Sequence, residues 1–454
     1  MSEIDARTRV LGIDVGTRTV KVALADMGGA GIRVLGRDES EPLEDCFTTG
    51  ELQNMDAVSA AVRRAVEGAY RSAQTEFNQD TDRVVAGVAG IGATMENVRD
   101  TWPLYSKVVR PEEMRELLRS AEWARADEGK IMWHNILQKY HVDKTVVQNP
   151  LNLSGYKVGV DCCLVWGDKK MLQDTWRLVE QAGVVPTSIV HKGLVTAEAV
   201  ANQHEKAAGC VVVDIGHETT SIVAYAGGSP IALTSIPMGS VYVTERIANV
   251  LGAAPGEEVE KKKTDFSWFG RSIDAAEGDD MSYLDANGEY AAVGAPALRA
   301  AIQEIMSVLF DQIRMVTLRC VFGFDGASAG RLALAPRLDR DMIVAHEPTQ
   351  NDASALSVFD NLVLCGKMTE QKGLKEWASG RFFNASARLG LARVGALPDR
   401  DAARYASAMG ICEYAFQDMR NETPIRLKLD QERLNPWGEQ VEPPRRSFWA
   451  RLKK

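Results

Sequence analysis

The stretch that decides the fold lies at residues 211–225 and reads VVVDIGHETTSIVAY. A β-branched run stops at Asp214 and Gly216, and a second apolar run follows a short polar tip. Such runs around glycine and small polar residues predict a strand, a tight turn and a second strand. Glycines at a tip let the backbone approach a bound anion, yet this tip carries His217 and Glu218. The stretch indicates either an anion-binding hairpin or one that keeps only the shape.

The same pattern occurs near the start of the chain, where residues 10–26 read VLGIDVGTRTVKVALAD. Asp14 and Gly16 correspond to Asp214 and Gly216, so the chain contains an internal repeat. A single Asp-x-Gly-Thr turn is common in unrelated loops and carries little information. Two facing copies, however, suit a triphosphate held between two similar domains, because backbone N–H groups at each tip cradle phosphates without side-chain charge.

Further residues fit a phosphate site of this design. Asp14 and Asp214 are expected to hold Mg²⁺ through water, and Lys21 on the return strand is expected to reach a phosphate as a point charge. A third element at residues 361–375 reads NLVLCGKMTEQKGLK and predicts a strand, a turn at Gly366 and a helix. In a nucleotide clamp this turn lies beside the adenosine, although an ordinary strand–turn–helix join explains the pattern equally well.

Length and composition narrow the class of protein. At 454 residues the chain is too long for one ordinary core, so two or more domains are expected. The net charge of −9 gives no support to nucleic-acid binding. The polar N-terminus indicates no signal peptide, and no apolar run approaches the roughly 18 residues of a transmembrane helix. The six histidines show no ligand-type spacing with cysteine or carboxylates, so no metal site of that kind is expected.

The seven cysteines are scattered along the chain. Most of them lie in apolar segments, which is typical of small buried hydrophobic side chains in a reducing cytosol and not of a disulfide framework. These are Cys162, Cys163, Cys210, Cys320 and Cys365.

The two hairpins and the third element, in this order, resemble the actin/Hsp70/sugar-kinase ATPase superfamily. Residues 149–155 narrow the resemblance, because they form an Asn-Pro-x-x-Leu-Ser-Gly run with Gln138 and Tyr140 upstream. This run resembles the bacterial cell-division family FtsA, in which it lies in a small extra subdomain that replaces one of actin's. Residues 178–202 and 405–415 also resemble FtsA. The similarity covers about residues 10–417.

The resemblance implies an α/β protein with the two-domain actin/Hsp70-like ATPase fold, an FtsA-type extra subdomain and a C-terminal amphipathic tail. The first domain is expected at 1–83 and 167–208, and the extra subdomain at 84–166. The second domain is expected at 209–252 and 321–420, with its own insertion at 253–320. Residues 297–320 of that insertion read as an amphipathic helix. A linker at 421–444 and a membrane-targeting helix at 445–454 complete the layout.

The resemblance also implies ATP with Mg²⁺ as the ligand of the two hairpins. Asp14 and Asp214 are the catalytic candidates, joined by Glu218, which is placed to position an attacking water. The residues expected to bind the nucleotide are Gly16, Thr17, Arg18, Thr19, Lys21, Gly216, His217, Thr219, Gly366 and Lys367.

Three departures from the FtsA pattern bear on this site. His217 and Glu218 replace two glycines, and Gly366 is followed by Lys367 where a second glycine is expected. The first hairpin has its lysine seven residues after Asp14, not five, which with the Glu-Thr-Thr tip is closer to PilM, the FtsA-like protein of type IV pilus assembly. A carboxylate about 4 Å from a phosphate charge costs on the order of 4 kcal/mol at an effective dielectric of 20. These departures favour ATP binding with slow hydrolysis at most.

The last ten residues, 445–454, read RRSFWARLKK and follow a Pro-rich connector. In a helix of roughly 100° per residue, Phe448, Trp449 and Leu452 fall within one arc of about 100°. The cations outside that arc are Arg451, Lys453 and Lys454. Aromatic side chains at headgroup depth and cations on anionic lipid are typical of an interfacial anchor, and FtsA ends in such a helix. A frayed basic terminus is the plainer alternative.

The leading hypothesis is therefore a cytoplasmic FtsA-like protein, peripheral on the inner face of the membrane at the division site. The resemblance implies that it binds the C-terminal tail of the tubulin-like protein FtsZ, anionic lipid, other division proteins and further copies of itself, head to tail. A PilM-like scaffold that binds a pilus membrane protein is the second hypothesis. A sugar-kinase-type phosphotransferase is the third, since fold alone does not fix function.

Overall fold

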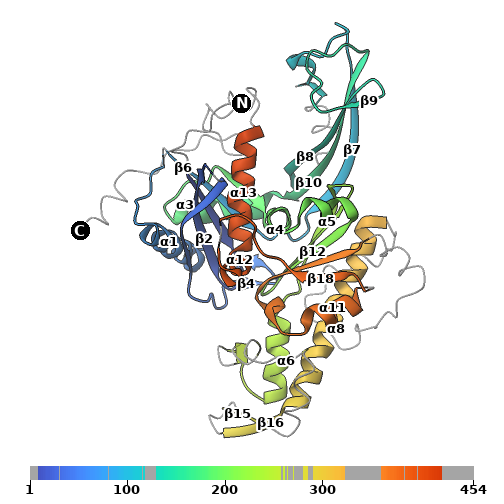
Figure 1. Ribbon diagram of the computed structural model, residues 1–454. Coiled ribbons are helices and arrows are strands. Elements are labelled where there is room, and N and C mark those ends of the chain that lie inside the picture. Colours follow the sequence, from blue (N-terminus) through green and yellow to red (C-terminus); the bar gives the residue numbers. More distant parts are fainter. Residues whose placement is uncertain are drawn as a thin grey trace.

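A computed structural model of the chain describes residues 9–29, 31–79, 81–114, 116–117, 129–256, 259–260, 263, 269, 280–284, 290–322, 359–382, 384–395 and 397–421 (Figure 1). The predicted membrane-targeting helix at 445–454 lies outside the described residues, as does the predicted linker after residue 421.

The first domain is built on a five-stranded sheet with the order β11-β6-β1-β2-β3. Its strands are β1 (Arg9–Val15), β2 (Val20–Gly28), β3 (Gly31–Glu39), β6 (Asp82–Val88) and β11 (Ser188–His191). The helices against it are α1 (Met55–Ser72), α3 (Lys169–Gln181), α4 (Lys192–Val200) and α13 (Ala406–Asn421). Because successive side chains of a strand point to opposite faces, Leu11 and Ile13 pack with α1 and α3, while Val10 packs with α4 and α13.

The second domain has a matching five-stranded sheet with the order β14-β13-β12-β17-β18. Its strands are β12 (Cys210–Ile215), β13 (Thr220–Ala226), β14 (Ser229–Ile236), β17 (Asn361–Cys365) and β18 (Ser386–Leu389). One face packs against α6 (Val241–Leu251), α8 (Ala295–Phe322) and α11 (Leu374–Arg381). On the other face Val212 and Val223 share a core with α4, α13 and the first sheet. Helix α4 thus lies between the two sheets.

The two predicted hairpins are confirmed. β1 and β12 each pair antiparallel with the next strand, and Asp14 and Asp214 occupy equivalent positions one residue before the strand ends. The predicted strand–turn–helix at 361–375 is confirmed as β17, the 3₁₀ helix η3 (Lys367–Glu370) and α11. The amphipathic helix predicted at 297–320 is α8, with Leu298, Ile302, Leu309 and Ile313 fully buried.

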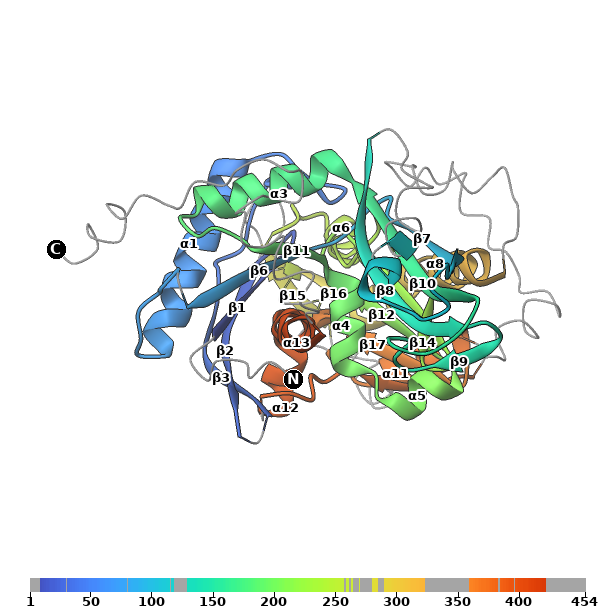
Figure 2. The ribbon, with the colours of Figure 1, turned by 90° about the horizontal axis from the view of Figure 1, so that it is seen from above.

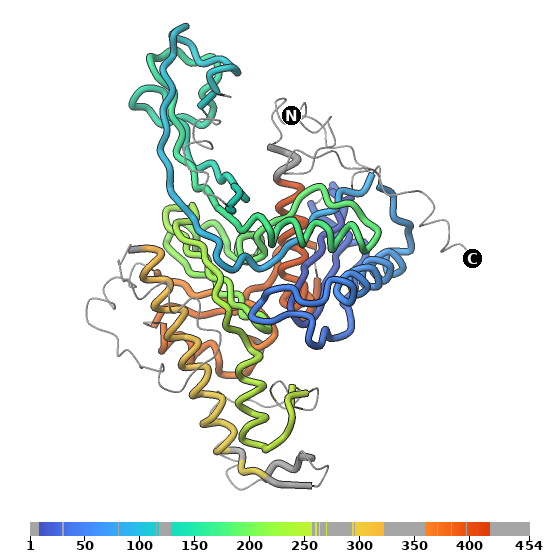
Figure 3. Tube along the Cα trace, turned by 180° about the vertical axis from the view of Figure 1, so that it is seen from behind, coloured from blue at the N-terminus to red at the C-terminus, as the bar shows by residue number. Residues whose placement is uncertain are grey.

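The extra subdomain is a four-stranded sheet with the order β7-β10-β8-β9 that projects from the body of the protein (Figure 3). Its strands are β7 (Thr94–Pro103), β8 (Lys130–Val142), β9 (Thr145–Val147) and β10 (Lys157–Asp168). In the Asn-Pro-x-x-Leu-Ser-Gly run, the Asn149 side chain accepts from the Leu151 N–H, and Gly155 lies against Val142. A Cβ at Gly155 would collide with that valine, which gives the run a packing role at the tip of this sheet.

Four predictions about domain limits and burial are wrong in detail. Strand β6 runs to Val88 within the first sheet, past the predicted limit at residue 83, and β10 carries the extra sheet to Asp168. Helix α13, placed by the sequence in the second domain, packs on β1, β2 and β6 of the first domain (Figure 2). It does so because Gly12 of β1 lets the α13 backbone approach closely. Cys320 is exposed near the end of α8, whereas the other six cysteines are buried; all seven are free thiols.

Smaller elements complete the described part of the chain. They are β4 (Phe47–Thr48), β5 (Glu51–Leu52), α5 (Gln203–Ala208), β15 (Asp280–Leu284), β16 (Tyr290–Gly294) and α12 (Asp399–Arg404). Within the described ranges, no helix is both long and apolar enough to cross a bilayer. The same residues contain no cluster of three His, Cys, Asp or Glu side chains that would hold a metal ion.

Candidate nucleotide cleft between the two domains

The two Asp-x-Gly tips have the same local geometry. A Cβ at Gly16 would come within 2.6 Å of the Thr19 carbonyl oxygen, and one at Gly216 within 2.8 Å of the Thr219 carbonyl oxygen. Each turn folds back so tightly that only glycine fits two residues after the aspartate. This close approach is the physical reason for the repeated Asp-x-Gly pattern in the sequence.

Asp14 and Asp214 are both buried, and one carboxylate oxygen of each faces a common point between the two domains. That point is occupied by Lys192, the first residue of α4, which the sequence analysis did not single out. Its Nζ lies 3.7 Å from Asp14 Oδ1 and 4.0 Å from Asp214 Oδ2. Neither of these two carboxylate oxygens has a hydrogen-bond partner among the described residues. The structure thus brings together one carboxylate from each domain and one ammonium from the helix between them.

Lys192 is charged in this setting. Burial lowers the pKa of its ammonium, but the charges of Asp14 and Asp214 outweigh burial and raise the pKa above its ordinary value. Burial raises the pKa of Asp214, and Lys192 offsets part of that rise, with a smaller contribution from Lys21. Lys21 itself lies across the hairpin from Asp14, and its Nζ is 3.9 Å from Glu39 Oε1 on β3. Lys192, not Lys21, is therefore the cation next to the two aspartates.

The Mg²⁺ predicted between Asp14 and Asp214 does not fit this arrangement. Buried carboxylate oxygens are suitable ligands for Mg²⁺ or its bound waters. However, the position that both oxygens face already holds a positive charge, Nζ of Lys192.

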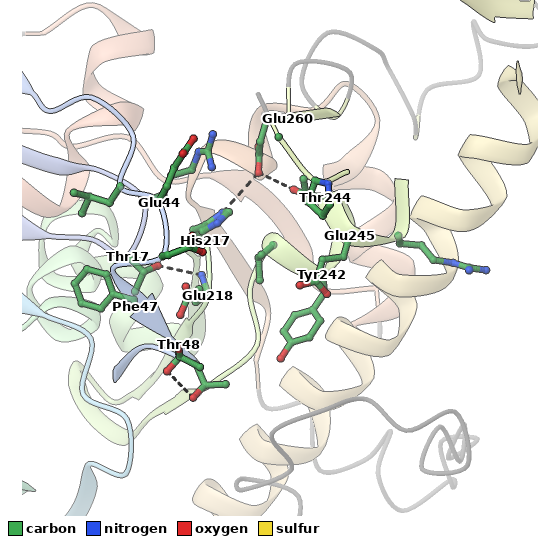
Figure 4. A pocket seen from close by; sticks show the side chains of 18 of the residues that line it. Thr17, Glu44, Phe47, Thr48, His217, Glu218, Tyr242, Thr244, Glu245 and Glu260 are labelled. Carbon is green, nitrogen blue, oxygen red and sulfur yellow. Dashed lines mark hydrogen bonds and ion pairs between the residues drawn. The ribbon is translucent and has the colours of Figure 1, made fainter. Parts of the chain in front are cut away.

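Glu218 joins the two domains at the hairpin tips (Figure 4). The Glu218 N–H donates to Thr17 Oγ1 at 3.2 Å, and the Glu218 carboxylate accepts from the Gly50 N–H at 2.8 Å. Neither His217 nor Glu218 has a positive φ angle. The glycines expected at this tip are thus not required by its backbone, and the Glu218 side chain uses the space to contact the first domain.

His217 lies in a polar network of the second domain that the sequence analysis missed. Its Nδ1 is 3.7 Å from Glu260 Oε1, and Glu260 accepts from Thr244 and from the buried Lys263. Burial and the Lys263 charge lower the pKa of His217 to about 4, against an opposing effect of Glu260. Burial likewise lowers the pKa of Lys263. The signal for the pair was its spacing, Glu260-x-x-Lys263, which places both residues on one side of a helical turn.

A cavity of about 940 Å³ opens beside these tips, with residues of both domains in its wall. Of the predicted site residues, Thr17, Arg18, His217 and Glu218 line it. The predicted residues that belong to the described chain but not to this wall are Asp14, Gly16, Thr19, Lys21, Asp214, Gly216, Thr219, Gly366 and Lys367. The wall is acidic, since it includes Glu44, Asp45, Glu218, Glu245, Glu260 and Glu304 against Arg18 and Arg246.

Gly366 and Lys367 differ in how the structure uses them. Gly366 has φ +97°, and a Cβ there would collide with the Ile215 carbonyl at the end of β12. The turn after β17 is therefore pressed against the second hairpin. Lys367 is exposed, and its charge is near enough to contribute to the lowered pKa of Lys263.

The chain is similar to known proteins both in sequence and in fold. No protein-family model matches the chain. The chain is 22% identical over 444 residues to the cell division protein FtsA of Escherichia coli, covering 95% of this chain and 97% of that protein. It is also 22% identical to FtsA of Helicobacter pylori over 400 residues, covering 84% of this chain and 75% of that protein. For FtsA of Bacillus subtilis the identity is 22% over 362 residues, or 76% and 78% of the two chains.

Among solved structures, one chain of the PilM–PilN type IV pilus biogenesis complex superimposes with a TM-score of 0.55 at 16% identity. It covers 90% of this chain and 98% of that chain. The match confirms the predicted actin-like fold, and the resemblance to FtsA with PilM in second place is confirmed as well. The chain is an actin-like two-domain protein whose sequence is similar to that of the FtsA cell-division proteins over most of its length.

Proposed function

We propose that the protein is an FtsA-like actin homologue that binds ATP between its domains and tethers a division filament of FtsZ to the inner face of the cytoplasmic membrane. In this role it helps to assemble the septal ring. The observation that carries the proposal is the extent of the FtsA similarity, 95% of this chain and 97% of the E. coli protein. A match of that extent leaves little of either chain unaligned.

In this proposal the nucleotide binds at the mouth of the cleft between the two domains. Arg18 supplies a phosphate contact, together with those backbone N–H groups of the two tips that are not bonded within the protein as the Glu218 N–H is. The 940 Å³ cavity is large enough for the remainder of the ligand. Glu218 is engaged with Gly50 of the first domain, so it is not oriented toward an attacking water. ATP then acts as a ligand that favours the closed state, and hydrolysis is slow at most.

The partners in this proposal are those that the resemblance to FtsA implies. The FtsZ tail docks on the insertion of the second domain, other division proteins bind the assembled ring, and copies of the chain associate head to tail. Anionic lipid is bound by the tail at 445–454, whose residues lie outside the described part of the chain.

A PilM-like scaffold is the second candidate, because the structural match covers 98% of a chain from the PilM–PilN complex. The lysine seven residues after Asp14 also favours it. In that case the partner is a peptide from a pilus membrane protein.

A pull-down separates the two candidates. The full-length protein is immobilised and offered an FtsZ C-terminal tail peptide or an N-terminal peptide of a PilN-type protein, with and without ATP. We expect retention of the FtsZ peptide, with the amount changed by ATP. Scrambled peptides of the same composition are the control. Retention of the pilus peptide alone would replace the first candidate by the second.

A further inference from the structure

We propose that Lys192 is a built-in cation that takes the place of a divalent metal ion between Asp14 and Asp214. The ammonium holds the two domains closed without metal. This inference goes beyond the proposed function, because it concerns how the protein's own charges are arranged and requires neither nucleotide nor partner.

The position of the ammonium supports this assignment. Mg²⁺ bonded to water at about 2.1 Å, with that water donating to a carboxylate at about 2.7 Å, stands roughly 4 to 5 Å from the carboxylate oxygen. Lys192 Nζ stands 3.7 Å from Asp14 Oδ1 and 4.0 Å from Asp214 Oδ2. The ammonium therefore lies close to the place that a water-bridged ion would take. A metal ion bonded directly to either oxygen would lie beside a fixed positive charge.

Lys192 also has little freedom to leave its position between the two carboxylates. It is buried, and it begins α4, the helix packed between the two sheets. The next residue, Gly193, lies so close to Ser221 of β13 that a Cβ there would collide with it. The Lys192 carbonyl also accepts a hydrogen bond from Thr196 Oγ1 at 2.9 Å. The start of the helix is thus fixed against the second sheet, with its lysine directed at both carboxylates.

The three charges come from different parts of the fold. Asp14 comes from β1 of the first domain, and Asp214 comes from β12 of the second. Two buried carboxylates that approach one another repel unless a cation lies between them. Opening the cleft separates at least one of the two carboxylates from the shared ammonium, so Lys192 makes closure of the two domains electrostatically favourable. A lysine provides this contribution at every metal concentration.

The test uses Mg²⁺ alone as the probe. The melting temperature of the full-length protein is measured by calorimetry in EDTA and along a Mg²⁺ titration, without nucleotide. Lys192→Met removes the charge and keeps the length of the side chain, and Lys192→Arg keeps the charge. The matched control is Lys206→Met, because Lys206 is also buried and pairs with a single carboxylate, Glu198, at 2.5 Å outside the cleft.

We expect the wild type and Lys192→Arg to melt at the same temperature in EDTA and in Mg²⁺. Lys192→Met should melt several degrees lower in EDTA and recover with Mg²⁺, because the ion then neutralises the two carboxylates. Lys206→Met should melt lower in both conditions without recovery. A wild type that gains as much from Mg²⁺ as Lys192→Met, or a Lys192→Met protein that does not respond, would overturn the proposal.

If Lys192→Met does not fold in either condition, titration calorimetry of folded proteins decides. Mg²⁺ binding by the wild type that Asp14→Asn abolishes would show a metal at the carboxylates and refute the inference. Equal heats of Mg²⁺ addition for the two proteins would support it. The proposed function is unaffected by either result, because its own test measures peptide retention.

Discussion

The tip of the second hairpin shows how two side chains change the chemistry of a backbone shape that occurs twice in the chain. Glu218 accepts from Gly50 across the domain boundary, and His217 enters a network with Glu260 and Lys263. Both residues are therefore used for contacts within the protein. An anion-binding tip made of glycines has its N–H groups free for a ligand, whereas here the Glu218 N–H already donates to Thr17.

His217 leads to a prediction about acid stability. Its pKa is lowered from 6.5 to about 4 by burial and by the cations Lys263 and Arg18, against the opposing charge of Glu260. A histidine with a lowered folded pKa stabilises the protein above its unfolded pKa, and that contribution is lost as the pH falls from 6.5 toward 4. His217→Gln removes this titration. The difference in unfolding free energy between pH 7 and pH 4 should shrink by roughly 3 kcal/mol.

Urea unfolding of the wild type and His217→Gln at a series of pH values measures this difference. His204→Gln removes an exposed imidazole and is the matched control. If the two variants lose stability with falling pH at the same rate, His217 is not the group responsible.

Site residues that belong to a local pattern could be predicted from the sequence. Those that the fold brings in from a distant part of the chain could not. Asp14, Asp214 and the glycines after them lie in a repeated motif whose turn geometry is encoded within a few residues. Lys192 belongs to no such motif. It reaches the aspartates because α4 passes between the two sheets, and no local pattern encodes that path. The only signal was a lysine at the start of a helix that is otherwise mostly apolar, with GLVTAEAV after His191 and Lys192.

Among the elements, the turn after β17 is fixed by its contact with the second hairpin. Gly366 combines φ +97° with a backbone atom of Ile215 directly in the path of a Cβ. From the sequence, Gly366 was expected either beside the adenosine or, equally well, in an ordinary strand–turn–helix join. The structure gives the glycine a packing reason that holds without any ligand.

Gly366→Ala should therefore destabilise the protein by roughly 3 kcal/mol or more, because the neighbouring atom is backbone and has little room to shift. The matched control is Gly380→Ala in α11, where a Cβ meets nothing within 4 Å. That substitution should stabilise the helix by up to about 1 kcal/mol. Chemical denaturation of both variants checks the pair. A Gly366→Ala protein as stable as the wild type would leave ligand contact as the reason for this glycine.

Strands, hairpins and the long helix α8 follow from periodicity, which is why these elements could be predicted. The assignment of α13 to the second domain failed for a different reason. Its apolar residues fit any sheet, and what selects the first sheet is the close approach at Gly12 and the contact with α4. Domain membership of a terminal helix depends on such long-range packing, and it is not encoded in the pattern of the helix itself.

In the whole molecule, the two domains are joined by more than the hairpin tips. Val10 and Ala23 of the first sheet, Val212 and Val223 of the second sheet, and helices α4 and α13 contribute to one continuous core. A shared core of this kind limits how far the domains separate, so a ligand in the cleft shifts a closing motion and does not assemble the protein. In the proposed function, tethering then depends on the tail at 445–454 and on the projecting subdomain.

The tail at 445–454 carries the last prediction. It holds five basic residues and no acid in a chain with a net charge of −9, so anionic lipid should attract this segment and repel the acidic remainder. Trp449→Glu places a charge within the apolar arc, whereas Ala450→Glu makes the same charge change outside it. We expect the wild type and Ala450→Glu to co-sediment with anionic liposomes, and Trp449→Glu and a deletion of 445–454 to remain in the supernatant. Neutral liposomes should retain none of the four proteins. Equal sedimentation of the two glutamate variants would reduce the tail to a basic segment without an amphipathic face.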